Sequence, residues 1–496
     1  MSIYFTICKK NDGLLAGLPK ICQMNAYPEK EILRKILLHN QTPLLQIRNI
    51  RLFILFRIMF NTRFYYPVFA ILFLDFGLSL EQFALLNVAW AISIVLLEVP
   101  SGAMADIIGR RNLLVTSAAI MVVEISLLCF APRGNITLLF AIFLANRILS
   151  GSAEACASGA DEAIAYDTLK KLDRSDEWPK VLEIQMRFGA MVQMVAMILG
   201  ALVYDPVLMQ KAADFIGLQI QLNQGITMRF PLYMTLAMAL GTLAVSLRML
   251  ESDSIEANRR IAGTKAGKPV KEAFKLTLKA GRWILQTPFV LMIILAGMFF
   301  DHWIRIIITL TSEYYRLIHL PEASFGLISA IVSSFGLFIP KIARKMGQTH
   351  TQLFNINIMC VLCIAGLAGM LMMIPFYGLI PAILLFCVMY INNYLQSYYL
   401  NPLTASEQRA TVLSFKGLSF NLAYGVMGLL YAGLLAYLRK RTSHVLPGLS
   451  GHELEDIVFI KSLIGFPCYF IFALAGLFWF GWIKLKRNKE YKKIQG

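Results

Sequence analysis

The chain has 496 residues, of which 57% are hydrophobic and only 16% are charged, and its formal net charge is +17. Soluble proteins carry about 25% charged residues, so this composition excludes an ordinary soluble domain. The positive charge does not indicate a nucleic-acid partner, because Lys and Arg cluster in loops rather than among stacking aromatic side chains. Long continuous apolar runs favour membrane-spanning α-helices over the short alternating segments of a β-barrel.

The first half of the chain contains six apolar segments of the length that a bilayer requires, which is roughly 20 residues. They follow residues 1–50, a mixed and basic stretch without a signal-peptide pattern, in which Met24 is an alternative start to Met1. The predicted spans cover residues 52–74, 83–104, 113–130, 136–160, 181–203 and 230–250.

A long hydrophilic interruption separates these spans from a second set of six. Its second half carries Leu278, Trp283 and Leu285 among lysines, which suits a helix lying on the bilayer surface. The later spans are predicted at 288–311, 322–340, 351–374, 377–400, 411–438 and 457–484. The predicted organisation is an N-terminal extension (1–50), a six-helix bundle (51–250), a basic linker (251–287), a second six-helix bundle (288–486) and a basic tail (487–496). The fold class is an all-α polytopic membrane protein with 12 spans in two pseudo-symmetric bundles.

Basic residues lie mainly in the loops after even-numbered spans, in the linker and near both termini. The positive-inside rule therefore predicts that both termini and the linker are cytoplasmic. The basic run 439–441 after span eleven departs from this pattern, and the acidic stretch 452–456 offsets it in part.

The corner between spans two and three carries a compact motif with the spacing Gly-x-x-x-Asp-x-x-Gly-Arg-Arg. Its members are Gly102, Asp106, Gly109, Arg110 and Arg111. We expect a tight basic turn of about seven residues between two helices. Glycine permits close approach of a neighbouring helix, the aspartate suits a positive helix N-terminus, and the arginines hold the loop on the cytoplasmic side.

The two sets of six spans, the basic linker, this corner and Arg147-x-x-x-Gly151-x-Ala153 in span four resemble the major facilitator superfamily over about residues 50–485. The resemblance implies a central cavity lined by spans one, four, seven and ten. It also implies that Asp106 docks at the start of span eleven, residues 406–409, and that Arg147 helps couple substrate to protons. The corresponding corner of the second half, 340–347, is degenerate, and the antiporter motif Gly-x-x-x-Gly-Pro is missing from span five.

Span four carries the richest polar pattern in the chain. Arg147, Gly151, Glu154, Ser158 and Asp161 follow one another at intervals of 4, 3, 4 and 3, which predicts one polar stripe along a single helix. An ionisable group at membrane depth costs about 2.5–3.5 kcal/mol on insertion scales, so the stripe must face the bundle interior. It is either a proton-coupling face or a structural salt-bridge seam.

Polar residues of other spans complete the predicted site. Arg63 in span one is a cavity-lining cation, and Glu124 in span three is its candidate partner, whereas Glu98 is an alternative acid that would bind the corner arginines. Asp301 and Arg305 in span seven are four residues apart and could satisfy each other. The candidate proton-coupling acids are Glu154, Glu124 and Asp301, since protonation of any of them would change the balance of buried charge and bias one conformation over the other. Two cations on spans one and four either favour an anionic or carboxylate-bearing substrate or serve as partners for acids on other spans. The expected uncharged substrate wall consists of Asn61, Asn392, Asn393, Gln396 and Asn421.

The leading hypothesis is a secondary transporter that moves a small organic solute by alternating access. A proton gradient is the expected energy source, because the sequence contains no phosphate-binding loop. Export of a metabolite or drug is slightly favoured; the alternatives are import of a nutrient or siderophore and a transport-inactive sensor. Neither His-Glu-x-x-His nor Gly-x-Ser-x-Gly occurs, so we expect no enzymatic activity, cofactor or metal. The expected partners are the lipid bilayer, the small-molecule substrate and protons, and the chain is expected to be a monomer in a bacterial inner membrane.

Overall fold

The computed structural model describes residues 43–251, 267–400, 403, 406–446, 448 and 451–486. Most of the predicted N-terminal extension, part of the linker and the basic tail lie outside these residues. Among the described helices, the side chains of Gly102, Asp106 and residues 406–411 are also outside the description.

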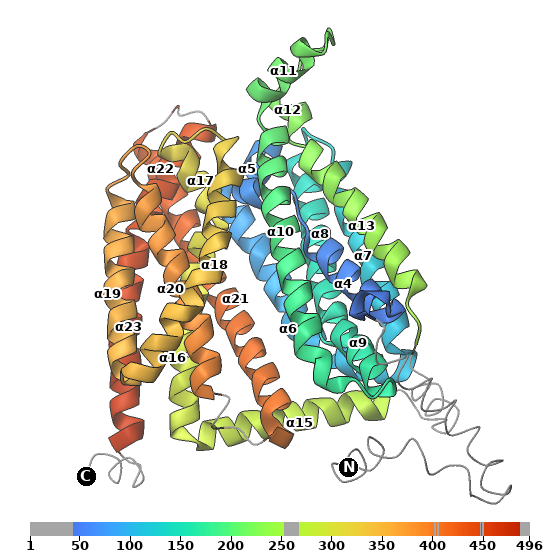
Figure 1. Cartoon of the computed structure of the whole chain (residues 1–496). Coiled ribbons are helices and arrows are strands. Elements are labelled where there is room, and N and C mark those ends of the chain that lie inside the picture. The colour runs from blue at the N-terminus through green and yellow to red at the C-terminus, as the bar shows by residue number, and fades with distance from the viewer. Residues whose placement is uncertain are drawn as a thin grey trace, which may run out of the picture.

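Two helical bundles stand side by side (Figure 1). The first contains α4 (Arg48–Asn61), α5 (Phe69–Phe76), α6 (Leu80–Ile108), α7 (Arg110–Cys129), α8 (Ile136–Ala157), α9 (Ala160–Lys171), α10 (Trp178–Tyr204), α11 (Pro206–Phe215), α12 (Gln224–Thr227) and α13 (Phe230–Arg248). The second contains α16 (Pro288–Thr309), α17 (Thr311–Leu317), α18 (Ser324–Thr349), α19 (Gln352–Leu371), α20 (Leu379–Leu400), α21 (Ser406–Val445), α22 (Gly451–Leu463) and α23 (Gly465–Lys486).

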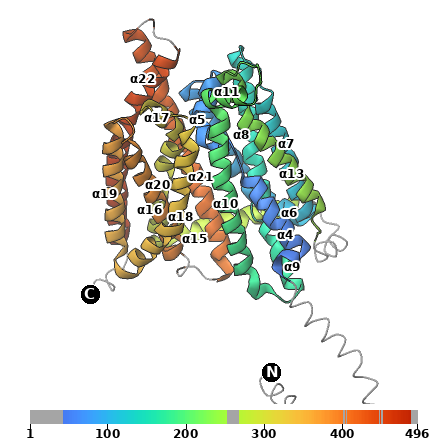
Figure 2. The same cartoon turned by 45° about the horizontal axis from the view of Figure 1, so that its top comes forward.

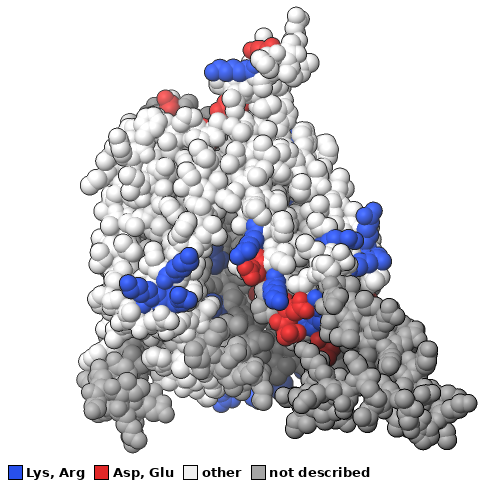
Figure 3. Space-filling model, in the orientation of Figure 1, with Lys and Arg blue, Asp and Glu red and all other residues white. Residues whose placement is uncertain are grey.

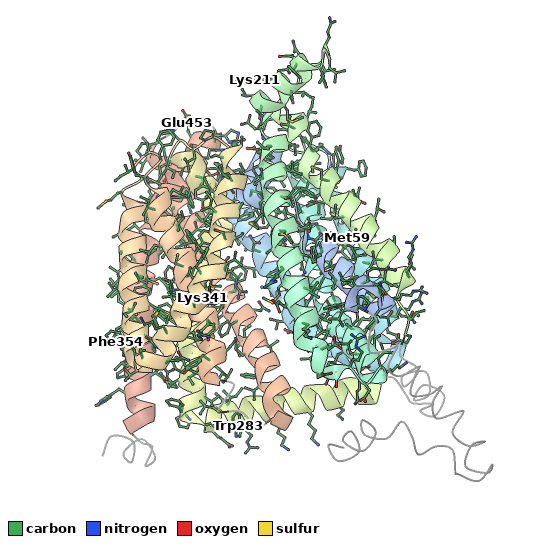
Figure 4. The ribbon with its side chains drawn as sticks, viewed as in Figure 1. Met59, Lys211, Trp283, Lys341, Phe354 and Glu453 are labelled. Carbon is green, nitrogen blue, oxygen red and sulfur yellow. The ribbon has the colours of Figure 1, made fainter. Side chains whose placement is uncertain are left out.

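Helix α15 (Gly267–Gln286) crosses one end of the molecule beneath both bundles (Figure 1). It packs against α6 of the first bundle and α21 of the second. We call this end the linker face and the other end the opposite face. Figure 4 shows Trp283 of α15 at the linker face, and Lys211 of α11 and Glu453 of α22 at the opposite face. The exposed side chains of α15 include Lys271, Lys275, Lys279 and Arg282 together with Leu278 and Leu285.

Eleven helical segments of the described chain are long and apolar enough to cross a membrane. The twelfth predicted span, 52–74, is discontinuous. Helix α4 ends at Asn61, and α5 begins only after a 3-10 turn at Tyr66–Val68. Pro67 lies in this turn and lacks an N–H, while the N–H of Phe64 donates to the Thr235 hydroxyl at 3.1 Å instead of to its own helix. With this broken span, the predicted all-helical multi-span fold is confirmed.

Charged side chains are distributed unevenly over the face seen in Figure 3. They gather toward the linker face and at the tip of the projecting α11, and a broad band between them is almost free of charge. Such a band matches the hydrocarbon core of a bilayer, where exposed charge is costly.

The corner after span two is tighter than the expected turn of about seven residues. Helix α6 continues to Ile108 and α7 begins at Arg110, so Gly109 alone makes the turn. Its φ of 91° and ψ of 147° lie in a region that residues with a Cβ rarely adopt. The corresponding segment of the second bundle, 340–347, does not turn at all, because α18 continues through it to Thr349.

The predicted stripe on span four is interrupted. Helix α8 ends at Ala157, and Gly159, with a φ of 76°, redirects the chain into α9. Arg147, Gly151 and Glu154 therefore share α8, whereas Asp161 belongs to α9 and pairs with Arg57 of α4 at 2.9 Å. The sequence spacing could not show this break, because Ser158 and Gly159 fit the helical period as well as any other small residues.

The bundles meet along two helix pairs, α6 with α21 and α10 with α18. Glycines permit both contacts. A Cβ on Gly326 of α18 would lie 2.2 Å from the Met197 carbonyl oxygen of α10, and a Cβ on Gly428 of α21 would lie 2.7 Å from a methyl group of Val88 on α6. Figure 2 tips the opposite face forward and shows α5 and α17 at the seam between the bundles, where the two helices pack against each other.

Candidate transport cavity

A cavity of about 340 Å³ lies between the two bundles, and we call it the central cavity. Its charged wall residues are Arg63, Arg147 and Glu154 from the first bundle and Arg305 from the second. Aromatic side chains supply much of the remaining wall: Tyr66, Phe69, Trp90, Tyr315, Phe386, Tyr390 and Tyr424. Three cations and one acid therefore face a largely apolar space.

Arg147 is 7% exposed and is held by uncharged groups. Its Nη2 donates to Asn87 Oδ1 at 3.0 Å, and its guanidinium lies 5.4 Å from the ring centres of both Phe69 and Trp90. Its Nε is buried without a hydrogen-bond partner among the described residues. Cation–π contacts stabilise the charge in part, but within the described chain no carboxylate forms an ion pair with this arginine.

Arg63 has a carboxylate partner, as the sequence suggested. Its Nη1 lies 3.3 Å from Glu124 Oε1, and both side chains are buried. The amide of Asn146 donates to the other carboxylate oxygen of Glu124 and to its backbone carbonyl. Glu124 thus lies behind the cavity wall and balances a cation that faces the cavity.

The second bundle repeats this arrangement with Arg305. Arg305 donates to Asp301 one turn earlier on α16 and to Asn421 Oδ1 of α21 at 2.9 Å. Its guanidinium lies 5.2 Å from the ring centre of Tyr424. Asp301 is 2% exposed, so the pair buries its acid and presents its cation to the cavity.

Glu154 is the point at which three cavities meet. It lines the central cavity, a neighbouring space of about 260 Å³ that includes Glu98 and Asn421, and a space of about 460 Å³ beside Arg57, Asn61 and Glu162. These two further spaces lie toward the linker face, where the surface between the bundles is hollowed (Figure 3). Within the described chain Glu154 forms no ion pair, so its carboxyl group can exchange a proton without breaking one.

Several residues of the expected substrate wall lie elsewhere. Asn392 and Gln396 of α20 are buried and donate to the carbonyls of Gly297 and Ile293 on α16, so they join two helices and do not line the central cavity. Asn393 is exposed and also lies outside it. Asn61 borders the space beside Arg57, and Gly151 lets α8 approach the Trp90 carbonyl, 2.7 Å from the position of a Cβ.

The corner residues bind within the first bundle. Arg110 pairs with Asp167 of α9 at 2.5 Å, and Arg111 donates to the Leu247 carbonyl of α13 at 2.8 Å. Glu98 does not bind these arginines; its Oε2 is buried without a partner in the described part of the chain. The expected contact between Asp106 and residues 406–409 involves side chains outside the description.

The opposite face is closed by polar contacts between the bundles that the sequence did not reveal. Arg316 of α17 donates to both carboxylate oxygens of Asp75 on α5, and Tyr204 donates to the same carboxylate. The Ser312 hydroxyl accepts from the backbone N–H groups of Ala70 and Ile71, at 3.0 and 3.3 Å, at the start of α5. In the sequence, Asp75 is an acidic residue at the end of an apolar helix. Such a residue is equally typical of an ordinary turn, so the sequence did not identify Asp75 as part of the closure.

A second acidic group is buried beside this closure. Glu313 of α17, outside the membrane-spanning helices, is 2% exposed. Burial raises the pKa of its carboxyl group to about 8; Arg316 opposes the shift, and Asp456 and Asp75 reinforce it. Burial also raises the pKa of Glu322, against the opposing effect of its ion-pair partner Arg316.

Comparison with known proteins identifies the family and the fold. The profile described as Major Facilitator Superfamily matches residues 52–427. No curated protein sequence matches the chain. The solved structure of the nucleoside transporter NupG has a TM-score of 0.59 at 12% identity, covering 88% of this chain and 99% of that chain.

Two further solved structures share the fold. A bacterial homologue of the human lysosomal transporter Spinster, in an inward-facing and unoccupied conformation, has a TM-score of 0.60 at 15% identity and covers 89% of this chain and 97% of that chain. A D-xylose-proton symporter has a TM-score of 0.53 at 14% identity, with 84% and 96% covered. At these identities the likeness concerns the fold alone. The family profile covers most of the chain, and the chain therefore belongs to the major facilitator superfamily of secondary transporters, not to the enzymes.

Proposed function

We propose that this transporter moves a small organic solute by alternating access and couples the movement to protons through Glu154. The observation that carries this proposal is the central cavity, which is closed at the opposite face by Asp75 and Arg316 and meets spaces toward the linker face at Glu154. A site between two bundles with one side closed is the arrangement that alternating access requires.

The closure can reverse because it consists of discrete polar contacts and glycine-mediated helix crossings. Breaking the Asp75–Arg316 pair and separating α10 from α18 at Gly326 would open the opposite face without unfolding either bundle. Helix α15 packs against both α6 and α21 and would continue to link the two bundles.

Coupling follows from the charges of the wall. Arg63 and Arg305 are balanced by Glu124 and Asp301, whereas Arg147 and Glu154 form no ion pair among the described residues. Protonation of Glu154 changes the net charge of the cavity by one unit and so biases the two conformations differently. The cations that interact electrostatically with an ionised Glu154 are Arg63 and Arg57.

The positive-inside distribution supports a cytoplasmic linker face, with both termini in the cytoplasm of a bacterial cell. The structure would then be open toward the cytoplasm. Net direction depends on whether solute and proton bind together or in competition, which the following experiment separates.

Untargeted metabolite comparison of cells with and without the protein identifies the solute. That solute is then offered to reconstituted vesicles with an imposed pH gradient. We expect the wild type to accumulate the solute in response to the pH gradient. Glu154→Gln should only equilibrate the solute across the membrane, and Arg147→Ala should not transport it. If the solute accumulates on the alkaline side against its own concentration gradient, it moves in the same direction as protons (symport). If it accumulates on the acidic side, it moves in exchange for protons (antiport). Glu183→Gln, on the exposed surface of α10, is the matched control. If Glu154→Gln and Arg147→Ala both transport at the wild-type rate with the same gradient dependence, the proposal is wrong.

A further inference from the structure

We infer that the solute is a small organic anion with a flat, apolar body, whose carboxylate or phosphate group binds Arg147 and whose body lies among the aromatic side chains of the central cavity. This inference rests on the proposed function and names the chemical class of its substrate.

The first step concerns the unsatisfied arginine. Arg147 is 7% exposed, and its Nε has no hydrogen-bond partner among the described residues. No carboxylate of the described residues pairs with this guanidinium, and a buried charge without a counter-ion is costly. The planar fork of an arginine matches carboxylate and phosphate groups with two parallel hydrogen bonds. An anion in the cavity would satisfy this group, whereas a neutral or cationic solute would leave it unpaired.

The second step concerns the charge of the side chains that line the cavity. The acids that balance Arg63 and Arg305 are Glu124 and Asp301, and neither lines the central cavity. Among the described residues, the wall of the cavity therefore contains three cations and one acid, Glu154. A solute in the cavity therefore meets the guanidinium groups of Arg63 and Arg305 directly, whereas the carboxylates that balance them do not line the cavity.

The third step concerns the body of the solute. The Arg147 guanidinium lies over the rings of both Phe69 and Trp90, 5.4 Å from each ring centre. Trp90 meets Tyr424 of the second bundle edge to face, with ring centres 6.4 Å apart. Arg305 lies over the Tyr424 ring at 5.2 Å. Cations and aromatic rings thus lie next to one another across the seam of the two bundles, and this arrangement suits a planar solute that contacts both.

The central cavity also limits the size of the solute and links its binding to a proton. A volume of about 340 Å³ is near the lower end of the usual range for ligand pockets, roughly 300–1,000 Å³, and fits one or two fused rings. An ionised Glu154 would repel an anion in the same cavity. The anion should therefore bind with Glu154 protonated, which makes solute and proton travel together.

The test measures binding without transport. The thermal unfolding midpoint of the purified full-length protein in detergent is recorded with 1-naphthoate, phenyl phosphate, 1-naphthamide and 1-naphthylmethylamine. We expect at least one of the two acids to raise the midpoint and the amide and amine to leave it unchanged. The two acids separate carboxylate from phosphate as the preferred group. Raising the pH should weaken binding of the acid to the wild type but not to Glu154→Gln.

Variants connect the binding to Arg147. Arg147→Gln should weaken the affinity for the acid by about tenfold or more, because it removes charge-assisted hydrogen bonds. Arg147→Lys retains the buried charge, so a folded protein with intermediate affinity is expected. Arg187→Gln, which removes an exposed arginine on α10, should bind as the wild type does.

Three results would overturn the inference: no stabilisation by either acid, equal stabilisation by the amide or the amine, or unchanged affinity in Arg147→Gln. Acid binding without gradient-driven transport of that acid would retain the substrate class and refute the proton-coupled transport. Transport of a cation with the expected gradient dependence would refute the substrate class and retain the proton-coupled transport.

Discussion

Arg316 of α17 donates to both carboxylate oxygens of Asp75 on α5, at 3.0 and 2.9 Å, and this pair ties one bundle to the other at the opposite face. Asp75 is nearly buried and also accepts from Tyr204, while Arg316 also binds Glu322. The closure of the opposite face thus depends on a specific ion pair, and the effect of removing that pair can be tested.

Asp75→Asn should weaken this closure. Removing one charge of a partly buried pair costs roughly 1–3 kcal/mol, so the ratio of closed to open molecules should fall by about tenfold. The measurement is labelling of Thr309→Cys, which lines the central cavity, by an impermeant maleimide from the opposite face, in a protein with its native cysteines replaced. Glu183→Gln breaks an exposed pair on α10 and should not alter the labelling. Identical labelling rates in all three backgrounds would show that the pair does not hold the face closed.

Alkaline pH should open the same face through Glu313. Its pKa, raised to about 8 by burial despite Arg316, keeps the carboxyl group protonated at neutral pH in the closed state. Opening hydrates the group and returns its pKa toward the ordinary value of about 4.3. The open state therefore binds fewer protons, and the closed state loses relative stability between about pH 4 and 8.

The reporter at Thr309→Cys should thus be labelled faster as pH rises from 6 to 9, after correction for maleimide reactivity measured on a free thiol. Glu313→Gln is neutral at every pH and should label at the low-pH rate throughout. A pH dependence that persists unchanged in Glu313→Gln would assign the effect to another group, the candidate being Glu322, whose pKa burial also raises.

Gly326→Ala should hinder closure by a steric route. The new Cβ would lie 2.2 Å from the Met197 carbonyl oxygen, and backbone cannot move aside as a flexible side chain can. Because α10 and α18 belong to different bundles, the clash acts on their docking more than on the fold of either one. Labelling of Thr309→Cys from the opposite face should increase. Gly476→Ala, in open space on α23, is the control, and equal labelling of the two variants would refute the prediction.

Arg63 and Glu124 should behave as a mutually dependent pair. Either Arg63→Gln or Glu124→Gln leaves a buried charge without its partner and should destabilise the protein by about 3–5 kcal/mol. The double variant removes both charges and should recover most of that loss, measured as the thermal unfolding midpoint in detergent. Additive losses in the double variant would mean that the two groups are stabilised independently.

Gly109→Ala should destabilise the corner between α6 and α7. A φ of 91° at this residue costs an alanine about 1–3 kcal/mol, so the unfolding midpoint should fall. Gly433→Ala on α21 has an ordinary helical backbone and open space around its Cβ, and it should be neutral or slightly stabilising. Equal midpoints for the two variants would contradict the strain assigned to Gly109.

The candidate site was only partly predictable from the sequence. Arg63, Arg147, Glu154 and Arg305 were expected from charge at membrane depth and do line the central cavity. Asn392 and Gln396 carried the same polar signal, but they satisfy carbonyls of α16. A polar residue within an apolar helix must find a partner, and its position in the sequence does not say whether that partner is a solute or a neighbouring helix.

The sequence by itself determined that this is a multi-span helical membrane protein and where its helices lie, because hydropathy over about 20 residues is a local property. It also determined the family, through the corner and the arrangement of spans. Only the tertiary structure decided that span one is broken at Pro67, that Gly109 alone makes the corner, and that Arg147 has no carboxylate partner among the described residues. These features depend on which helices meet. An ion pair such as Asp75–Arg316 joins residues 241 positions apart, and only the folded packing determines that they touch.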